Sequence, residues 1–337
     1  MKYFFLLFIP LFISCIPEED PVVPKDRGDL ESGYMDKSIY DYQGFFDLGT
    51  NQFISFNSKT SWDIAFDCND NFIIMNGARP VKGAFIDFNN FELSDDKYTP
   101  DSLFIDEANG DLINSAMGRW WIDETGNEIK QSKIFYLDRG RDERRRPLGT
   151  YKLQVIDWDQ ESYTIRYANI NDTTIQEMKI YRDQNYNFVY FNFDDSTLTQ
   201  VEPHKNSWDL FFTEKSEYVP LNAIGTSEDS EAIPYQVRGV YLNPYNVEAI
   251  LYENLDSLDF NMITRDDVIS LNLSKELNVI GYDWKNFSLQ GEVYAVDPNK
   301  IYIVKDTDGL LYKFRFISFF SKDGGERGYI SFEFQQL

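Results

Sequence analysis

Hydrophobic and polar residues alternate in short stretches along most of the chain. The alternation is clearest at residues 53–56, 151–155, 165–167, 188–193, 312–316 and 329–334. Because successive side chains of a β-strand point to opposite faces, this period of two is typical of strands that bury one face. Turn-forming sequences separate the stretches, and the turn at residues 306–309 predicts a hairpin between residues 301–305 and 310–317. No long segment has the period of a helix, and residues 266–277 are the best candidate for a short one.

The chain also repeats itself in a fixed order. Residues 61–66 (SWDIAF) return as residues 207–212 (SWDLFF), 146 positions later. Further matches follow in the same order: residues 72–76 with 218–222, Trp121 with Trp284, 133–137 with 300–304, and 151–156 with 312–317. Such self-similarity indicates a duplicated structural unit. We therefore predict an all-β fold of two tandem antiparallel units with little helix, unit one at residues 36–170 and unit two at residues 173–337.

The distance between matching positions grows along the unit. It is 146 before the middle of the unit and 161–167 after it. Unit two therefore carries about twenty extra residues, which we place between Asn222 and Trp284. Insertions fall mostly in loops, and recognition residues are often found there.

The composition excludes some classes of function. The 337 residues carry a net charge of −24, from 32 basic and 56 acidic residues. Nucleic acids and anionic lipids repel such a polyanion, so we expect no nucleic-acid partner. Aromatic residues make up 17% of the chain. This fraction suits the half-buried surface of a sheet and is unlike that of a disordered acidic chain.

The N-terminal residues have the pattern of an export signal. Lys2 precedes an apolar stretch that runs to Ile13 and is too short to span a bilayer. The stretch ends in Leu-Phe-Ile-Ser-Cys, which resembles the lipobox of bacterial lipoproteins. That resemblance implies a signal peptide at residues 1–15 and a lipid anchor on Cys15. The alternative is an ordinary secretory signal in which the cysteine is incidental.

An acidic cluster, Glu18-Glu19-Asp20, follows this cysteine and resembles the surface-export signal of Bacteroidota lipoproteins. It implies a protein anchored in the outer membrane and facing outward, and the alternative is the periplasmic leaflet. Three prolines and a charged run further predict that residues 16–35 form a disordered acidic tether.

The sequence offers little material for catalysis or for a metal centre. It has one histidine, His204, and a single cysteine besides the lipobox residue, Cys68. We therefore expect no disulfide and no Cys-rich metal site, and we interpret Cys68 as a buried packing residue. A Gly-rich phosphate loop and a Gly-x-Ser-x-Gly elbow are also absent from the sequence.

Two Trp-Asp pairs recur with hydrophobic flanks, at Trp62-Asp63 and Trp208-Asp209. Their repetition favours a structural role, with a buried indole and a carboxylate that accepts backbone hydrogen bonds. With 56 acidic residues, no particular pair can be assigned to glycoside hydrolysis. We predict that the protein is not an enzyme.

The order of these motifs resembles the HmuY family. The order is a strand, the Trp-Asp strand, Asn-Gly, a variable middle, a Trp and a Tyr-Lys-rich hairpin. Residues 46–66 and 300–334 are the stretches most similar to the family. The resemblance implies an all-β fold of many antiparallel strands. It also implies a Bacteroidota lipoprotein that captures a haem-type ligand for an outer-membrane receptor of the TonB-dependent kind. Tandem copies depart from the single-unit members of the family.

Haem iron takes axial ligands from His, Met, Cys or Tyr. The resemblance implies that they come from the variable middle, as a His pair or a Met pair. One histidine cannot form a pair, so the candidate haem contacts are Met117 in the middle of unit one and Met262 in that of unit two. The alternative is that both methionines fill gaps in a core.

One basic cluster stands out in this acidic chain. It consists of Arg139, Arg141, Arg144, Arg145 and Arg146. One interpretation is a solvated hairpin tip, and the other is a docking patch for an acidic partner or an anionic ligand.

Together these patterns predict an outer-membrane surface lipoprotein that binds a ligand, with haem or a related porphyrin as the candidate, for hand-over to an outer-membrane transporter. The alternative is a non-enzymatic surface interaction or adhesion module with a degenerate ligand site. An extracellular hydrolase ranks last.

Overall fold

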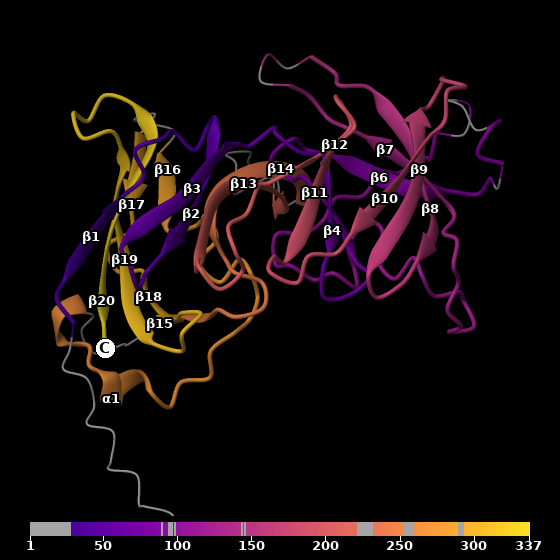
Figure 1. The fold of residues 1–337 in the computed structure, drawn as a ribbon. Coiled ribbons are helices and arrows are strands. Elements are labelled where there is room, and N and C mark those ends of the chain that lie inside the picture. The colour runs from indigo at the N-terminus through magenta and orange to yellow at the C-terminus, as the bar shows by residue number, and fades with distance from the viewer. Residues whose placement is uncertain are drawn as a thin grey trace, which may run out of the picture.

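The computed structural model describes residues 28–88, 90–93, 97, 99–142, 144, 146–220, 232–252, 259–288 and 293–337. It confirms the predicted all-β class, with 46% strand, 3% helix and several antiparallel sheets. Within the described ranges, no helix combines the length and the hydropathy that crossing a membrane requires. Four of the sheets form two β-sandwiches that lie side by side (Figure 1).

The first sandwich uses one continuous part of the chain. A five-stranded sheet has the order β10-β9-β8-β7-β6, and a four-stranded sheet has the order β12-β11-β4-β5. Their strands are β4 (Ile64–Asp67), β5 (Ile73–Met75), β6 (Lys82–Ile86), β7 (Ile134–Asp138), β8 (Thr150–Trp158), β9 (Ser162–Asn169), β10 (Gln176–Tyr181), β11 (Phe188–Asn192) and β12 (Thr197–Thr199). One hydrophobic core joins the two sheets and includes Phe66, Phe135, Ile165 and Phe191.

The second sandwich combines both ends of the described chain. Its sheets have the orders β1-β20-β19-β18-β15 and β14-β13-β2-β3. Their strands are β1 (Glu31–Tyr34), β2 (Tyr42–Asp47), β3 (Gln52–Ser58), β13 (Leu210–Pro220), β14 (Ala232–Leu242), β15 (Glu248–Tyr252), β18 (Ile301–Lys305), β19 (Leu311–Phe320) and β20 (Arg327–Gln336). A separate hairpin, β16 (Lys285–Ser288) with β17 (Val293–Val296), and two short helices, η3 (Phe260–Met262) and α1 (Arg265–Val268), complete this half.

The two sandwiches have the same strand order and the same register. Phe191 lies opposite Ile64 in the first sandwich, and Phe46 lies opposite Leu210 in the second. Each sequence repeat is therefore divided between the sandwiches, because β1–β3 complete the second and β10–β12 complete the first. This differs from the boundaries at residues 36–170 and 173–337. The repeats show which strands correspond, but equivalent hairpins can pair in the same register with either copy.

Residues 28–35 belong to the second sandwich. Strand β1 pairs with β20 along its whole length, and Gly28 N donates a hydrogen bond to Gln336 O at 3.1 Å. The prediction of a disordered tether is therefore wrong for this segment. The remainder of the tether and Cys15 lie outside the described residues.

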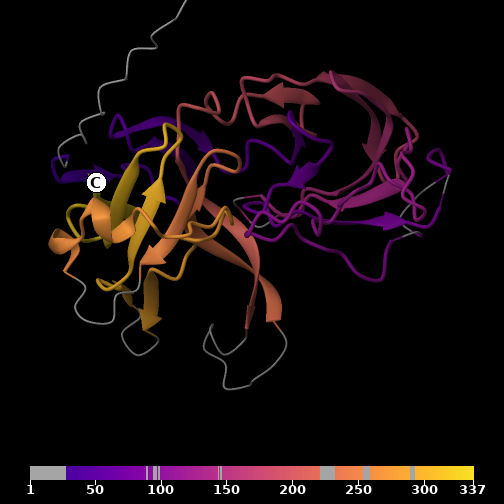
Figure 2. The ribbon, with the colours of Figure 1, turned by 90° about the horizontal axis from the view of Figure 1, so that it is seen from below.

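The extra residues of the second repeat extend one hairpin. Asn76 Nδ2 donates to the carbonyl of Trp62, and Asn243 Nδ2 donates in the same way to that of Trp208. Asn243 is therefore the counterpart of Asn76, in place of the predicted Asn222, which lies outside the described residues. Strands β13 and β14 have 11 residues each, whereas β4 and β5 have 4 and 3. Figure 2 shows this long hairpin projecting from the molecule.

Two further local predictions can be compared with the structure. The hairpin predicted around residues 306–309 is confirmed as β18 paired with β19. The helix predicted at residues 266–277 is largely wrong, since α1 ends at Val268. Leu271 and Leu273 follow it without regular secondary structure and pack on a small core that includes residues of β18.

The alternation of side chains gives the four-stranded sheets two apolar faces. On β4, Phe66 points into the first sandwich and Ala65 points to the junction between the sandwiches. On β13, Phe212 likewise points into the second sandwich and Phe211 points to the junction. A third core therefore lies between the sandwiches. It consists of Phe45, Trp62, Ala65, Phe188, Tyr190, Val201 and Trp208.

Candidate functional site

The aspartates of the two Trp-Asp pairs connect strands of different repeats. Asp63 Oδ2 accepts a hydrogen bond from Phe193 N at 2.8 Å, and Asp209 Oδ2 accepts one from Leu48 N at 2.8 Å. Both aspartates are buried. The predicted structural role is confirmed for these carboxylates, because each holds the hairpin of the other repeat in place.

Arg139 does not belong to a surface patch. Its side chain is buried, and Nη2 forms ion pairs with Asp63 at 3.0 Å and with Asp194 at 2.6 Å. Arg79 Nη1 contacts the same Asp63 at 2.5 Å. The sequence interpretation of Arg139 as a docking residue is wrong, because an aspartate far away in sequence neutralises it inside the fold.

The rest of the basic cluster forms a surface loop. Arg141, Arg144 and Arg146 are exposed, and Arg145 lies outside the described residues. Arg146 also forms an ion pair with Asp142 at 2.7 Å. A docking role for this loop stays a prediction.

The structure does not bring the two candidate methionines together. Met117 is 2% exposed and packs with Trp120 and Trp121 in the core of the first sandwich. Met262 is 72% exposed in η3, beside the second sandwich. The two sulfur atoms therefore cannot bind opposite sides of one iron.

Met117 lines a hollow with a volume of about 520 Å³, which we call the Met117 hollow. The other residues that line it are Phe85, Arg119, Trp120, Ile122, Asp123, Glu124, Thr125, Ile129 and Lys133. Hydrogen bonds fix the segment that carries Met117: Asp106 Oδ1 accepts from Ala116 N at 2.9 Å, and Trp120 Nε1 donates to Asn71 O at 2.8 Å. The volume lies within the usual range of ligand pockets, about 300–1,000 Å³.

Two cations border this hollow. Arg119 and Lys133 are exposed, and neither forms an ion pair with another residue in the described part of the chain. The carboxylate of Asp123 forms hydrogen bonds within its own turn, where Oδ1 accepts from Thr125 N and from Asn127 N, each at 2.9 Å. Asp123 and Glu124 also line the hollow, so its formal charges balance, but Arg119 and Lys133 remain available as cationic donors to an anionic group of a ligand.

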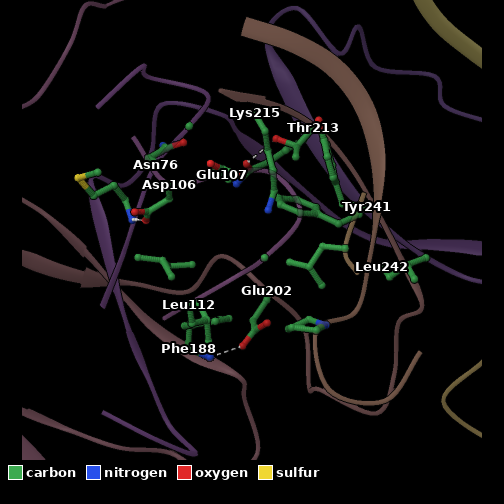
Figure 3. A pocket seen from close by; sticks show the side chains of 18 of the residues that line it. Asn76, Asp106, Glu107, Leu112, Phe188, Glu202, Thr213, Lys215, Tyr241 and Leu242 are labelled. Atoms are coloured by element: carbon green, nitrogen blue, oxygen red, sulfur yellow. Dashed lines mark hydrogen bonds between the residues drawn. The ribbon is translucent and has the colours of Figure 1, made fainter. Parts of the chain in front are cut away.

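A second, more enclosed space lies between the sandwiches, and we call it the junction cavity (Figure 3). Its volume is about 140 Å³, and its walls are mostly apolar. Side chains of both repeats form it in corresponding positions, since Trp62 packs edge-on to Tyr190 and Trp208 packs edge-on to Phe45, each at 4.9 Å between ring centroids.

Three of the charged side chains that line the junction cavity have shifted pKa values. Burial raises the pKa of Asp106 to about 6 and that of Glu202 to about 8, although both carboxylates accept backbone hydrogen bonds. Burial also lowers the pKa of Lys215 to about 8. Perturbed groups that converge in one cavity are typical of binding and catalytic sites.

The sequence alone did not single out these three residues. Each is one charged residue in a chain with 56 acids and 32 bases, and Asp106 lies far in sequence from the other two. The only signal was the repeated Trp-Asp motif, whose tryptophans line the cavity.

Cys68 and His204 line neither the Met117 hollow nor the junction cavity. Cys68 is buried, as predicted, and burial raises the pKa of its thiol to about 11. His204 is exposed and packs against Tyr186 at 4.9 Å. Among the residues that the structure describes, no group of three or more His, Cys, Asp or Glu side chains is arranged to hold a metal ion.

Comparison with known proteins identifies a family. The model of the HmuY family, described as HmuY protein, matches residues 39–334. No curated protein matches the chain.

Solved structures give distant matches. Apo PinO from Porphyromonas gingivitis is 10% identical and has a TM-score of 0.29, over 92% of this chain and 97% of that one. The apo HmuY analog from Tannerella forsythia is 11% identical and has a TM-score of 0.24, over 92% and 98%. A candidate HmuY-like heme binding protein from Bacteroides vulgatus is 15% identical and has a TM-score of 0.18, over 53% and 95%. The family model, rather than these superpositions, carries the assignment.

Proposed function

The chain belongs to the HmuY family, and from this premise we propose that it captures a haem-type ligand at the outer membrane surface and hands it to a transporter there, without transforming it. Haem is the candidate because the Bacteroides vulgatus protein is described as heme binding. The observation that carries the proposal is the Met117 hollow, which combines a thioether, aromatic walls and two unpaired cations.

The chemistry of the hollow matches the parts of a porphyrin. The flat apolar macrocycle needs an apolar wall, which Phe85, Trp120 and Ile122 supply. Its two carboxylates need cations, which Arg119 and Lys133 supply at the border. Bound haem would also present an iron that accepts a thioether ligand.

Only one residue of the hollow can bind iron in this way. The lining residues include Met117 but no His, Cys, Tyr or second Met. The proposed site therefore offers one axial ligand, and the expectation of a symmetric pair does not apply to it. Met117 is nearly buried, whereas Arg119 and Lys133 are exposed.

Titration with hemin tests this proposal. The protein is expressed without residues 1–15, which removes no described residue, and the Soret band is followed in the oxidised and reduced states. We expect a saturable shift at one equivalent for the unchanged protein. Met117→Leu keeps the packing volume and removes the sulfur, so it should lose the ligation spectrum. Met262→Leu is the matched control and should keep it.

Two outcomes would contradict the proposal. If hemin produces no saturable shift, the haem interpretation is wrong, while the family and the fold are unaffected. If Met117→Leu and the unchanged protein give the same spectrum, haem binds elsewhere. The charge reversals Arg119→Glu and Lys133→Glu should each weaken binding at least fivefold if carboxylates bind at the border.

The membrane anchor needs its own test because Cys15 lies outside the described residues. We expect the full chain to incorporate labelled fatty acid and to sediment with outer membranes. Cys15→Ser should abolish both properties. Protease added to intact cells distinguishes outward exposure from the periplasmic leaflet, since only an outward-facing protein is cleaved.

The long β13–β14 hairpin supports a second candidate, a surface interaction module. Tyr218 and Tyr235 lie on its two strands and are 40% and 46% exposed. Exposed aromatic residues on a projecting element are typical of protein contacts. A protein that binds no hemin, but binds cells less well after Tyr218→Ser and Tyr235→Ser, would favour this candidate.

A further inference from the structure

The junction cavity gathers buried hydrogen-bond donors that have no acceptor among the described residues. They are Gln43 Nε2, Trp62 Nε1, Trp208 Nε1 and the Tyr241 hydroxyl. Buried polar groups are nearly always paired, because an unpaired donor loses its hydration without compensation. Four such donors around one cavity point to an occupant rich in acceptors.

A fifth donor, the ammonium group of Lys215, borders the same space. Figure 3 shows the side chain of Lys215 pointing into the cavity, near the ring of Tyr241. Nζ lies 4.9 Å from the centroid of that ring. No carboxylate among the described residues forms a direct ion pair with Lys215, although Asp106 and Glu217 influence its charge. The ammonium group therefore lacks a bound counter-ion in its immediate contact shell.

Two acidic side chains of the cavity, Asp106 and Glu202, accept hydrogen bonds from backbone N–H groups, and Glu214 is paired with Lys59 and Arg238. Asp106 accepts hydrogen bonds from Met75 N at 2.6 Å and from Ala116 N at 2.9 Å. Glu202 Oε1 accepts one from Phe188 N at 2.7 Å. Because the pKa of Glu202 is about 8, this group is mostly uncharged at neutral pH and does not compensate the lysine.

The walls and the volume set the size of the occupant. The apolar walls include Phe45, Leu112, Phe188, Phe211 and Leu277. The volume is about 140 Å³, and a dry apolar cavity of about 150 Å³ in another protein binds benzene. A single aromatic ring with a small substituent therefore approaches the limit of this cavity.

We propose that the junction cavity is a second ligand site, which takes a small carboxylate with an apolar body, such as a monocyclic aromatic acid. Lys215 forms an ion pair with the carboxylate, and the indole N–H groups of Trp62 and Trp208 together with Gln43 donate hydrogen bonds to the occupant. The aromatic side chains of both repeats enclose its ring. This site is separate from the Met117 hollow, so it does not depend on haem binding.

The charges around the cavity predict how pH affects binding. The charged groups that line it or act on Lys215 are Asp106, Glu107, Asp111, Glu202, Glu214, Glu217 and Lys275. Burial raises the pKa of the three lining tyrosines, Tyr190, Tyr241 and Tyr245, above the usual value, so these stay neutral in this pH range. As pH rises from 6 to 9, Lys215 loses its charge and Glu202 gains one, since both have a pKa of about 8. Both changes weaken the binding of an anion. Deprotonation of Asp106 above pH 6 acts in the same direction.

Calorimetric titration with benzoate tests the proposal, with benzamide as the uncharged analogue of the same shape. We expect saturable 1:1 binding of benzoate at pH 6.5, and at least tenfold weaker binding of benzamide. The affinity for benzoate should fall at least tenfold between pH 6.5 and pH 9.

Three variants locate the site. Lys215→Met keeps an unbranched side chain and should weaken benzoate binding at least tenfold. Lys179→Met is the matched control, because this exposed strand lysine also lies over a tyrosine ring, at 5.3 Å. It should change the affinity less than twofold. Glu202→Gln removes an acid and should reduce the loss of affinity above pH 8, which gives a second readout if Lys215→Met folds poorly.

Several results would overturn the proposal. Equal binding of benzoate and benzamide, or unchanged affinity in Lys215→Met, would each do so. So would the absence of saturable benzoate binding up to about 10 mM, because a specific site that includes an ion pair should have a Kd of about 1 mM or lower. Hemin added to the benzoate complex separates the two sites. Competition between hemin and benzoate would contradict their independence.

Discussion

Substituting the two equivalent aspartates by asparagine should have unequal effects on stability. Asp63 and Asp209 occupy corresponding positions, and each accepts one hydrogen bond from the hairpin of the other repeat. Asp63 also neutralises Arg79 and Arg139, whereas Asp209 accepts its remaining hydrogen bonds from Thr307, at 2.9 Å from N and 3.1 Å from Oγ1. The same substitution therefore removes an ionic partner in one sandwich and only an acceptor for neutral donors in the other.

The expected loss in the free energy of unfolding follows from these contacts. Asp63→Asn places an amide where Arg79 and Arg139 need an anion, and removing one partner of a buried ion pair costs about 3–5 kcal/mol. Asp194 still contacts Arg139 at 2.6 Å, which favours the lower end of this range. Asp209→Asn keeps one acceptor oxygen and loses about one hydrogen bond, so we expect a loss of about 1–2 kcal/mol.

Urea unfolding followed by far-UV circular dichroism measures the difference. With an m-value of about 2 kcal/mol/M, Asp63→Asn should lower the midpoint by about 1.5–2 M, and Asp209→Asn by less than about 1 M. At pH 5 the effect of Asp209→Asn should shrink, because burial raises the pKa of Asp209 to about 6 and the acid is then largely protonated. Equal losses for the two variants at pH 7 would refute the ionic role of Asp63.

Three further predictions concern stability. Gly33→Ala should lower the free energy of unfolding by about 1–3 kcal/mol, because its Cβ would lie 2.1 Å from the ring of Phe332. Thermal unfolding checks this, and an unchanged melting temperature would mean that β1 does not contribute to stability. Burial raises the pKa of Glu202 to about 8, so this acid should reduce stability as pH rises from 5 to 8, by at most about 1.4 kcal/mol per pH unit. Glu202→Gln should flatten that pH profile, and parallel profiles for the two proteins would contradict the assignment. Arg139→Met should lower the free energy of unfolding by about 3 kcal/mol or more, whereas the exposed variant Arg146→Met should change it by less than about 0.5 kcal/mol. Similar urea midpoints for the two variants would contradict the buried ionic role of Arg139.

The sequence predicted the strands better than their partners. Alternation located the β18–β19 hairpin because its two strands and its turn are adjacent in the chain. It could not show that β2 pairs with β13 rather than with β4, since both pairings would use the same kinds of residues in the same register. Residues 28–35 were misjudged for a related reason. Prolines and charges dominate the preceding segment, while the partner strand, β20, lies at the other end of the chain.

For the candidate sites, too, the sequence predicted the residue types better than the contacts that they form. Met117 is a candidate because the HmuY resemblance implies haem ligands in the variable middle of the unit, and the structure adds the hollow that it lines. Arg139 was assigned to a surface loop because its neighbours in sequence are charged, but its ionic partner, Asp63, is 76 residues away. Local sequence shows the charge of a residue, whereas its burial depends on partners that only the fold brings near.

The junction cavity is best explained by the differences between the two repeats. Positions that correspond in strand register carry different residues there: Ala65 corresponds to Phe211, and Ile74 corresponds to Tyr241. Two identical repeats would have produced a symmetric junction, with the same donors on both sides. Here Tyr241 and Lys215 both come from the extended β13–β14 hairpin of the second repeat. One repeat alone could form neither the enclosure nor the donor set, so a ligand site at this position requires both the duplication and the later divergence of its copies.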